Sequence, residues 1–205
     1  KDYPRQTELT GFESLEITKV VNNNAKLYAN KEEGFVGTNL KKEDNAELIC
    51  ECSDLSEIIV IHKDGKYVVT KVSEKAFFGK DILYVGLFDR NDQRTIYNVI
   101  YREGKTAISY AKRFAVTSVT RDKQYDITQG TPGSQILWFT VNHNGEAETV
   151  KIYFRQRAKL KKLIDEYDFS SLLIKGKASR GNLVSKKPIQ KIILKSKGAS
   201  TIGGK

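Results

Sequence analysis

The chain has 205 residues, of which 39% are hydrophobic and 10% aromatic, enough for a packed core and too many for a disordered chain. No apolar run approaches the roughly 18 residues of a membrane helix, and residues 1–5 do not resemble a signal peptide. The formal net charge is +10, and residues 151–205 carry 15 Lys and Arg against 3 Asp and Glu. Such asymmetry fits a polyanion (DNA, RNA or an anionic membrane), or simply a solvated basic surface.

Five short runs of β-branched and aromatic residues predict strands. In chain order they cover residues 17–21, 57–62, 95–100, 136–141 and 171–174. Each run precedes a polar turn, and the turns centre on Ala25, Gly65, Gly104, Gly145 and Gly181. Asp-Gly and Asn-Gly pairs favour hairpins, because Gly tolerates a positive φ.

The five turn centres are 40, 39, 41 and 36 residues apart. A β-rich repeat of this length is typical of propeller-like rings, so we expect an all-β ring of about five four-stranded blades over residues 17–205. Residues 1–16 then form a linker or an edge strand that closes the ring. Residues 157–166 have apolar positions at helical spacing and form either a short helix or a basic loop.

The residues that most often bind metals or perform catalysis are few. Cys50 and Cys52 form half of a metal motif, but no second Cys pair exists and His62 and His143 are isolated. Because zinc needs about four ligands, we expect free thiols and no metal site. The two histidines are expected at strand ends. No acids recur with the repeat, which disfavours a propeller-type hydrolase, and we expect no catalytic residue and no cofactor.

Basic residues recur with the repeat. Lys31, Lys71, Lys151 and Lys187 each lie six residues after a turn centre, and Lys112 lies eight residues after Gly104. Equivalent positions in radially arranged blades fall on one rim, which would offer a track of cations to a bent phosphate backbone. The alternative interpretation is that these lysines only mark strand ends that face solvent.

Three segments carry a family resemblance: residues 26–37, 72–80 and 179–184. They resemble the C-terminal domain of the A subunits of the bacterial type II topoisomerases, and most closely that of topoisomerase IV of the Bacteroides type. The resemblance covers roughly residues 17–205 and implies a β-pinwheel, a ring whose blades exchange strands. It also implies that the chain is a fragment of a larger protein.

One loop departs from the gyrase relatives in this family. Gyrase carries a basic, glycine-rich box in its first blade that serves to wrap DNA. The matching residues 32–37 are acidic at Glu32 and Glu33, and residues 129–134 and 200–205 are only degenerate copies. This departure favours topoisomerase IV over the gyrase wrapping domain, which stays the alternative.

The resemblance implies binding and bending of duplex DNA, so that segments reach a catalytic core for ATP-dependent strand passage, decatenation and supercoil relaxation. The active-site tyrosine of the family lies in a separate N-terminal breakage-reunion domain, and an ATPase B subunit completes the enzyme. A cytoplasmic, nucleoid-associated location follows, without a membrane partner. The expected DNA contacts are Lys71, Lys80, Lys105, Lys112, Arg113, Arg121, Arg155, Arg157, Lys159, Lys161, Lys162, Lys177, Arg180, Lys186, Lys187 and Lys191. A propeller that binds protein partners through its loops is a second alternative.

Overall fold

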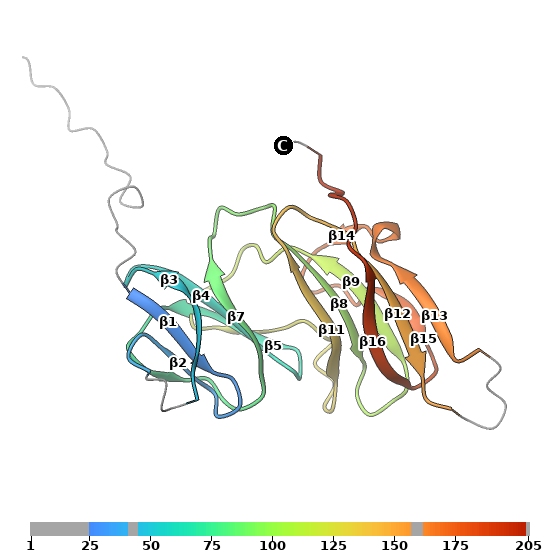
Figure 1. Ribbon diagram of the computed structural model, residues 1–205, viewed down its shortest axis with the longest axis horizontal. Coiled ribbons are helices and arrows are strands. Elements are labelled where there is room, and N and C mark those ends of the chain that lie inside the picture. Colours follow the sequence, from blue (N-terminus) through green and yellow to red (C-terminus); the bar gives the residue numbers. More distant parts are fainter. Residues whose placement is uncertain (1–24, 41–44, 157–161, 204–205) are drawn as a thin grey trace, which may run out of the picture.

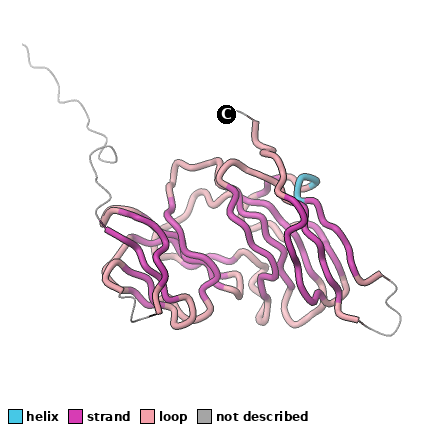
Figure 2. The backbone as a smooth tube through the Cα atoms, viewed as in Figure 1, coloured by secondary structure: helices cyan, strands magenta, loops and turns pink. Residues whose placement is uncertain are grey.

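The computed structural model describes residues 25–40, 45–156 and 162–203. In these residues the chain folds almost entirely into strands, and the one helical element is the short 3-10 turn η2 (Phe169–Ser171) (Figure 2). The strands form four sheets that follow one another in an arc, from sheet 1 near residue 25 to sheet 4 near the C-terminus (Figure 1). The expectation of an all-β fold is confirmed.

The sheets share one plan, in which a hairpin lies at the centre. Sheet 1 has the order β3 (Glu47–Cys52), β1 (Ala25–Asn30), β2 (Phe35–Gly37), β6 (Ala76–Phe77). Sheet 2 has the order β10 (Gln124–Asp126), β5 (Lys66–Lys71), β4 (Glu57–His62), β7 (Ile82–Phe88). Sheet 3 has the order β11 (Gln135–Asn142), β8 (Ile96–Arg102), β9 (Ser109–Phe114), β14 (Ile174–Lys175), with β15 (Asn182–Ser185) also on β9. Sheet 4 has the order β13 (Ile164–Asp168), β12 (Thr149–Phe154), β16 (Ile189–Ser196).

Each of the first three sheets is completed by a strand from later in the chain. The second hairpin strands β2, β5 and β9 pair with β6, β10 and β14–β15, which lie between later strands of the next sheet. The third strand of each repeat then returns to pair with the first strand of its own hairpin. Neighbouring sheets are therefore joined by backbone hydrogen bonds as well as by packing.

Three apolar cores lie between successive sheets. Strand β4 shows why its sequence is hydrophobic without a break: Ile58 and Val60 belong to the core shared with sheet 1, while Ile59 and Ile61 belong to the core shared with sheet 3. Strand β8 repeats this arrangement, since Val99 lies in the core toward sheet 2 and Ile100 in the core toward sheet 4. A strand buried on both faces needs apolar residues at every position.

The sequence repeat and the structural repeat have different phases. Gly65 and Gly104 form the β4–β5 and β8–β9 hairpin turns, as expected, and β4 covers the expected residues 57–62. Ala25 instead begins β1, and the turn of that hairpin contains Gly34. Gly145 lies between β11 and β12, which belong to different sheets, so the prediction of a hairpin there is wrong. Asn-Gly marks a reversal of the chain, and a reversal also occurs where the chain passes to the next sheet.

The fifth repeat does not form a sheet of its own. Gly181 lies just before β15, which completes sheet 3, and β16 completes sheet 4. The described residues thus form four sheets where about five blades were expected. Residues 171–174 were expected as a strand, but they follow η2 and reach β14 only at Ile174. Residues 1–24, with the expected strand at 17–21, lie outside the described residues.

Residues 157–166 were expected to form either a short helix or a basic loop, and the described part of this range contains no helix and ends in a strand. Ile164–Asp168 form strand β13, which pairs along its full length with β12. The helical spacing of the apolar residues arose by chance, because a basic stretch of sequence is followed directly by a strand. Residues 157–161 lie outside the described residues.

The hairpin turn at Gly34 shows how the exchange of strands between neighbouring sheets limits which residues fit. Gly34 has φ +87°, and a Cβ at this position would lie 2.1 Å from the carbonyl oxygen of Gly79 in the incoming segment. The Gly34 carbonyl accepts a hydrogen bond from the Phe78 N–H at 2.8 Å. The turn and the segment that forms β6 therefore approach too closely for any side chain.

We expect Gly34→Ala to lower the free energy of unfolding by about 3 kcal/mol or more, because it combines a disfavoured φ with a backbone clash. Gly176→Ala is the matched control, since a Cβ there has no neighbour within 4 Å, and it should change stability by less than about 0.5 kcal/mol. Urea unfolding of both variants measures the difference. Equal stabilities would contradict this account of the turn.

Candidate nucleic-acid interface

The ends of the four hairpins lie on one side of the molecule, the lower side in Figure 1. Backbone contacts link neighbouring ends. The Ile82 N–H donates to Lys31 O at 3.1 Å between sheets 1 and 2, and the Ile136 N–H donates to Lys63 O at 2.8 Å between sheets 2 and 3. Ser185 pairs with Ser109 and so joins the third end to residues 186–188, whose Pro188 O accepts from the Arg155 N–H at 2.9 Å. We call this surface the tip rim; its described residues are 31–34, 63–65, 78–82, 103–108, 131–135, 155–156, 162–163 and 186–188.

Charge changes sign along the tip rim. At the sheet 1 end, Glu32 and Glu33 are exposed, and Lys31 is paired with Glu47. At the sheet 4 end, Arg155, Lys186 and Lys187 are exposed without an acid partner among the described residues. The rim thus offers an anion its most favourable contacts at the C-terminal end of the arc.

Four cations at that end form what we call the basic cluster: Arg155, Lys186, Lys187 and Lys191. Strand register and packing bring them together. Arg155 follows β12, and its N–H donates to the Pro188 carbonyl. Lys191 lies opposite Tyr153, and its ammonium group is 4.8 Å from the centroid of that ring. The Lys187 ammonium group is 5.5 Å from the ring centroid of Phe154. The aromatic faces position the lysine stems while the charged ends stay in solvent.

Other cations expected to contact DNA are also exposed. Lys80 and Lys105 lie on the tip rim, whereas Lys71 lies at the opposite end of its strand. Arg180 covers the ring of Tyr110 at 5.6 Å. None of these four forms an ion pair with another described residue.

Three further cations of the expected set are already engaged. Arg121 shares Glu57 with Arg90, with Nη2 2.6 Å from the carboxylate. Partial burial raises the pKa of Glu57, but the hydrogen bonds and charge of the two arginines outweigh it and hold the pKa below its ordinary value. Lys162 pairs with Asp165 at 2.7 Å, and Lys177 donates to the carbonyls of Thr117 and Ser118. Arg157, Lys159 and Lys161 lie outside the described residues.

Lys112 and Arg113 are buried, so their inclusion among the DNA contacts is corrected. Lys112 is 2% exposed and Arg113 is 1% exposed. Both lie on β9, the strand of sheet 3 that receives β14 and β15. A side chain with so little exposed surface does not reach a phosphate group.

Lys112 instead fixes the segment between β14 and β15. Its ammonium donates to Lys177 O at 2.7 Å and to Ser179 O at 3.0 Å, and lies 4.9 Å from the Phe114 ring centroid. Burial lowers the pKa of Lys112 to about 8, and the charge of Asp126 partly opposes that shift. The lysine thus supplies two hydrogen bonds to carbonyls that the exchanged strands leave without a ladder partner.

Arg113 joins sheet 3 to the C-terminal segment. Its guanidinium donates to Asn98 Oδ1 at 2.9 Å, to Thr201 Oγ1 at 2.8 Å and to the carbonyls of Gly145 and Glu146. Asn98 in turn donates to Glu148 at 2.6 Å. Glu148, 4% exposed, also accepts hydrogen bonds from the side chains of Trp138 and Thr140. The role of Arg113 is to organise the junction of sheets 3 and 4.

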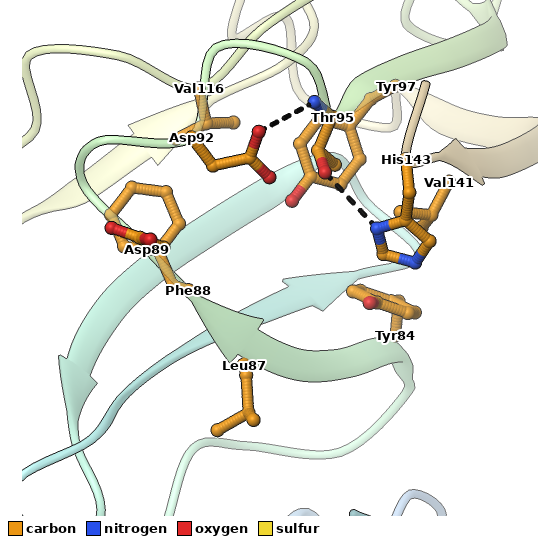
Figure 3. Close-up of a pocket in the computed structure, with 10 residues that line it drawn as sticks. All are labelled: Tyr84, Leu87, Phe88, Asp89, Asp92, Thr95, Tyr97, Val116, Val141 and His143. Carbon is orange, nitrogen blue, oxygen red and sulfur yellow. Dashed lines mark hydrogen bonds between the residues drawn. The ribbon is translucent and has the colours of Figure 1, made fainter. Parts of the chain in front are cut away.

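A pocket at the opposite strand ends, between sheets 2 and 3, contains His143 and Asp92 (Figure 3). His143 Nδ1 lies 3.1 Å from Thr95 Oγ1, and Asp92 accepts hydrogen bonds from the N–H groups of Arg94 and Thr95. The second carboxylate of the pocket, Asp89, accepts from the Asn91 N–H. Both acids therefore stabilise turns, and we assign no chemistry to this pocket. His143 directly follows β11, and His62 is the last residue of β4, both strand ends as expected.

The described residues contain no group of three or more potential metal ligands. Cys50 and Cys52 are free thiols on β3, and burial raises the pKa of both. No helix in the described part of the chain is long and apolar enough to cross a membrane.

The profile of the family described as "Topoisomerase C-terminal domain, Bacteroidota" matches residues 26–197. The chain belongs to this family. The match covers strands of all four sheets and both ends of the tip rim, so the surfaces described above belong to the matched domain.

Two known proteins resemble this family member. The A subunit of DNA topoisomerase 4 from Borreliella burgdorferi is 28% identical over 127 residues, which are 62% of this chain and 20% of that protein. The crystal structure of the C-terminal domain of DNA topoisomerase IV matches with a TM-score of 0.50 at 11% identity, covering 84% of this chain and 62% of that one. At this identity the match shows the fold, and it confirms the expected β-pinwheel class. The chain spans about a fifth of the length of the Borreliella relative.

Sequence reasoning missed two cations, one on the tip rim (Lys63) and one directly beside it (Arg102). Lys63 precedes the Gly65 turn, and Arg102 ends β8 with its guanidinium bonded to the carbonyls of Gly104 and Gly133. The signal was available, since each lies within two residues of a turn glycine. A search for cations within two residues of each turn glycine would have found them. The search six residues after each turn centre did not.

We expect the stability of this topoisomerase domain to depend on Lys112 and on pH. The folded pKa of about 8 lies below the unfolded value of about 10.4, so the unfolded state binds the proton more tightly. The stability of the wild type relative to Lys112→Met should therefore rise between about pH 8 and 10, by at most about 3 kcal/mol. Urea unfolding at pH 7.5 and 9.5 measures this rise. A difference that is constant across pH would contradict it.

Proposed function

We propose that this chain is the DNA-binding C-terminal domain from the A subunit of a topoisomerase IV, and that it holds a bent duplex along the tip rim. The observation that carries the proposal is the basic cluster, four exposed cations without acid partners among the described residues at one end of a continuous rim. The relatives support it, because both are named as topoisomerase IV.

Binding along the rim would be electrostatic. Each Lys or Arg that neutralises a phosphate releases condensed counterions, which makes binding depend strongly on salt and little on base sequence. The rim follows the arc of the four sheets, so a duplex that keeps contact with successive hairpin ends has to bend. No step of this kind needs a catalytic group in the chain.

The acidic end of the rim favours topoisomerase IV over a gyrase wrapping domain. Glu32 and Glu33 repel phosphates at the first hairpin, where a wrapping domain needs cations. We infer a short, bent contact that presents a DNA segment to the rest of the enzyme. We propose that, within the full-length protein, the domain works with a breakage-reunion domain and an ATPase B subunit, in the cytoplasm and on the nucleoid, in the ATP-dependent passage of one duplex through another.

A domain that binds proteins through the same loops is the competing function. It predicts binding that is insensitive to salt and indifferent to duplex DNA. The test is therefore the salt dependence of duplex binding, combined with a variant that removes the basic cluster.

We expect the quadruple variant R155Q/K186Q/K187Q/K191Q to bind a random-sequence duplex weakly, with a log–log salt slope shallower by up to about 0.9 for each phosphate that is no longer neutralised. Fluorescence anisotropy at several salt concentrations measures the slope. The matched control K26Q/K123Q/K175Q/K197Q also removes four exposed lysines, from the ends of the strands away from the rim, and should retain most of the binding.

Two results would count against the proposal. A wild-type slope near zero would favour the protein-binding alternative. Equal weakening of both quadruple variants, at matched thermal stability, would show that only the net charge attracts DNA and that the rim is not a track.

A further inference from the structure

A hollow lies on the tip rim between the hairpin ends of sheets 2 and 3. Its walls come from the β4–β5 turn, the loop before β7 and the loop before β11, and they include His62, Lys63, Lys80, Arg102 and Gly133. We propose that this hollow is a seat for a phosphodiester group of a duplex held on the rim, an inference that rests on the proposed function.

The first cation of the hollow is held rigidly. Arg102 Nε donates to Gly104 O at 3.2 Å, and its Nη2 donates to Gly133 O at 3.3 Å. These bonds fix the plane of the guanidinium at the wall of the hollow. Its remaining N–H groups form no hydrogen bond with other described residues, and a fixed guanidinium suits the oxygens of a phosphate.

Two lysines from neighbouring repeats converge on the same place. Lys80 lines the hollow, and the Lys80 carbonyl lies 3.4 Å from His62 Nδ1. Lys105 does not line the hollow but lies beside it, because its Cγ is 2.9 Å from where a Cβ of the lining residue Gly133 would be. Both side chains are exposed and form no ion pair with a described residue. The exchange of strands between sheets 2 and 3 is what brings them together.

The acids at the hollow are already neutralised. Asp81 pairs with Lys63 at 3.2 Å, and Asp64 pairs with Lys66 at 3.2 Å. These two pairs cancel, which leaves Lys80, Lys105 and Arg102 against Glu103, whose carboxylate lies 3.5 Å from Oγ of the lining residue Ser134. A net excess of two cations around one hollow fits an anion carried on a polymer better than a neutral ligand.

The floor of the hollow is backbone. Gly130 and Gly133 both have positive φ, +75° and +85°, and they flank Pro132 in an exposed loop. Without side chains at the two glycines, a phosphate group approaches the loop closely. This loop belongs to residues 129–134, one of the two degenerate copies of the glycine-rich box. We infer that the cations that bind the phosphate come from adjacent hairpins and not from the loop itself.

The test uses the 205-residue chain and a 40-bp random-sequence duplex. Lys80 and Lys105 make no side-chain hydrogen bond within the described structure, so K80Q/K105Q should fold normally. We expect its salt slope to be shallower by up to about 1.8, that is about 0.9 for each of the two phosphates released. K80R/K105R should restore the slope. The control K26Q/K123Q removes two exposed lysines away from the rim and should leave the slope near that of the wild type.

Arg102→Lys is the second variant, because it keeps the charge and loses the planar fork. It should weaken duplex binding severalfold with little change in slope, while the melting temperature reports any loss of the bonds to Gly104 and Gly133. Inorganic phosphate, titrated against the wild type with the His62 ring observed by NMR, tests a free anion as the ligand.

The outcomes separate the two proposals. If the wild type binds duplex but K80Q/K105Q behaves like K26Q/K123Q, the hollow is not a phosphate seat and the proposed function stands. If inorganic phosphate binds the hollow while duplex affinity is unchanged in K80Q/K105Q, the assignment to DNA is overturned. If the wild type binds no duplex, the hollow and the proposed function both fall.

Discussion

The second strand of each hairpin exposes a row of backbone N–H and C=O groups, and these must be paired wherever the sheets pack together. The chain pairs them in three sheets with a strand that belongs to the following repeat. This exchange sets the spacing of the sheets, fixes the order of the hairpin ends along the rim, and places Lys80 and Lys105, from different repeats, at one hollow. The functional surface follows from the way the backbone satisfies its own hydrogen bonds.

Two buried cations support the last exchange. Lys112 holds the segment between β14 and β15, and Arg113 holds the C-terminal segment near Thr201. Burying a charge is costly unless it is paired or hydrogen-bonded, and both residues meet that condition through carbonyl oxygens and, for Arg113, the network that leads to Glu148. Removing Lys112 would take the ammonium donor from the carbonyls of Lys177 and Ser179, and removing Arg113 would take the donor from the buried Asn98 Oδ1. These losses explain why the two positions are not apolar.

Sequence patterns predicted the strands best where local chemistry alone decides the structure. The run at residues 57–62 and the turns at Gly65 and Gly104 are examples, because β-branching and positive φ act within a few residues. The hydrogen-bond partners of Lys112 lie 65 and 67 residues away in the sequence, and no local pattern predicts them. The same limit applies to the phase of the repeat, since Gly145 has the signature of a hairpin turn while the strands on either side pair elsewhere.

Sheet 4 differs from the other three in the described structure, because β13 has no donated partner. An open strand edge is a template onto which another chain can add by hydrogen bonding, and this is a common route to aggregation. Asp165, Glu166 and Asp168 give this edge three carboxylates within five residues, in a region otherwise rich in lysine. Stacking the same strand from a second molecule in register would bring these like charges together. The acids of β13 thus oppose such stacking at the edge of sheet 4 that has no donated strand among the described residues.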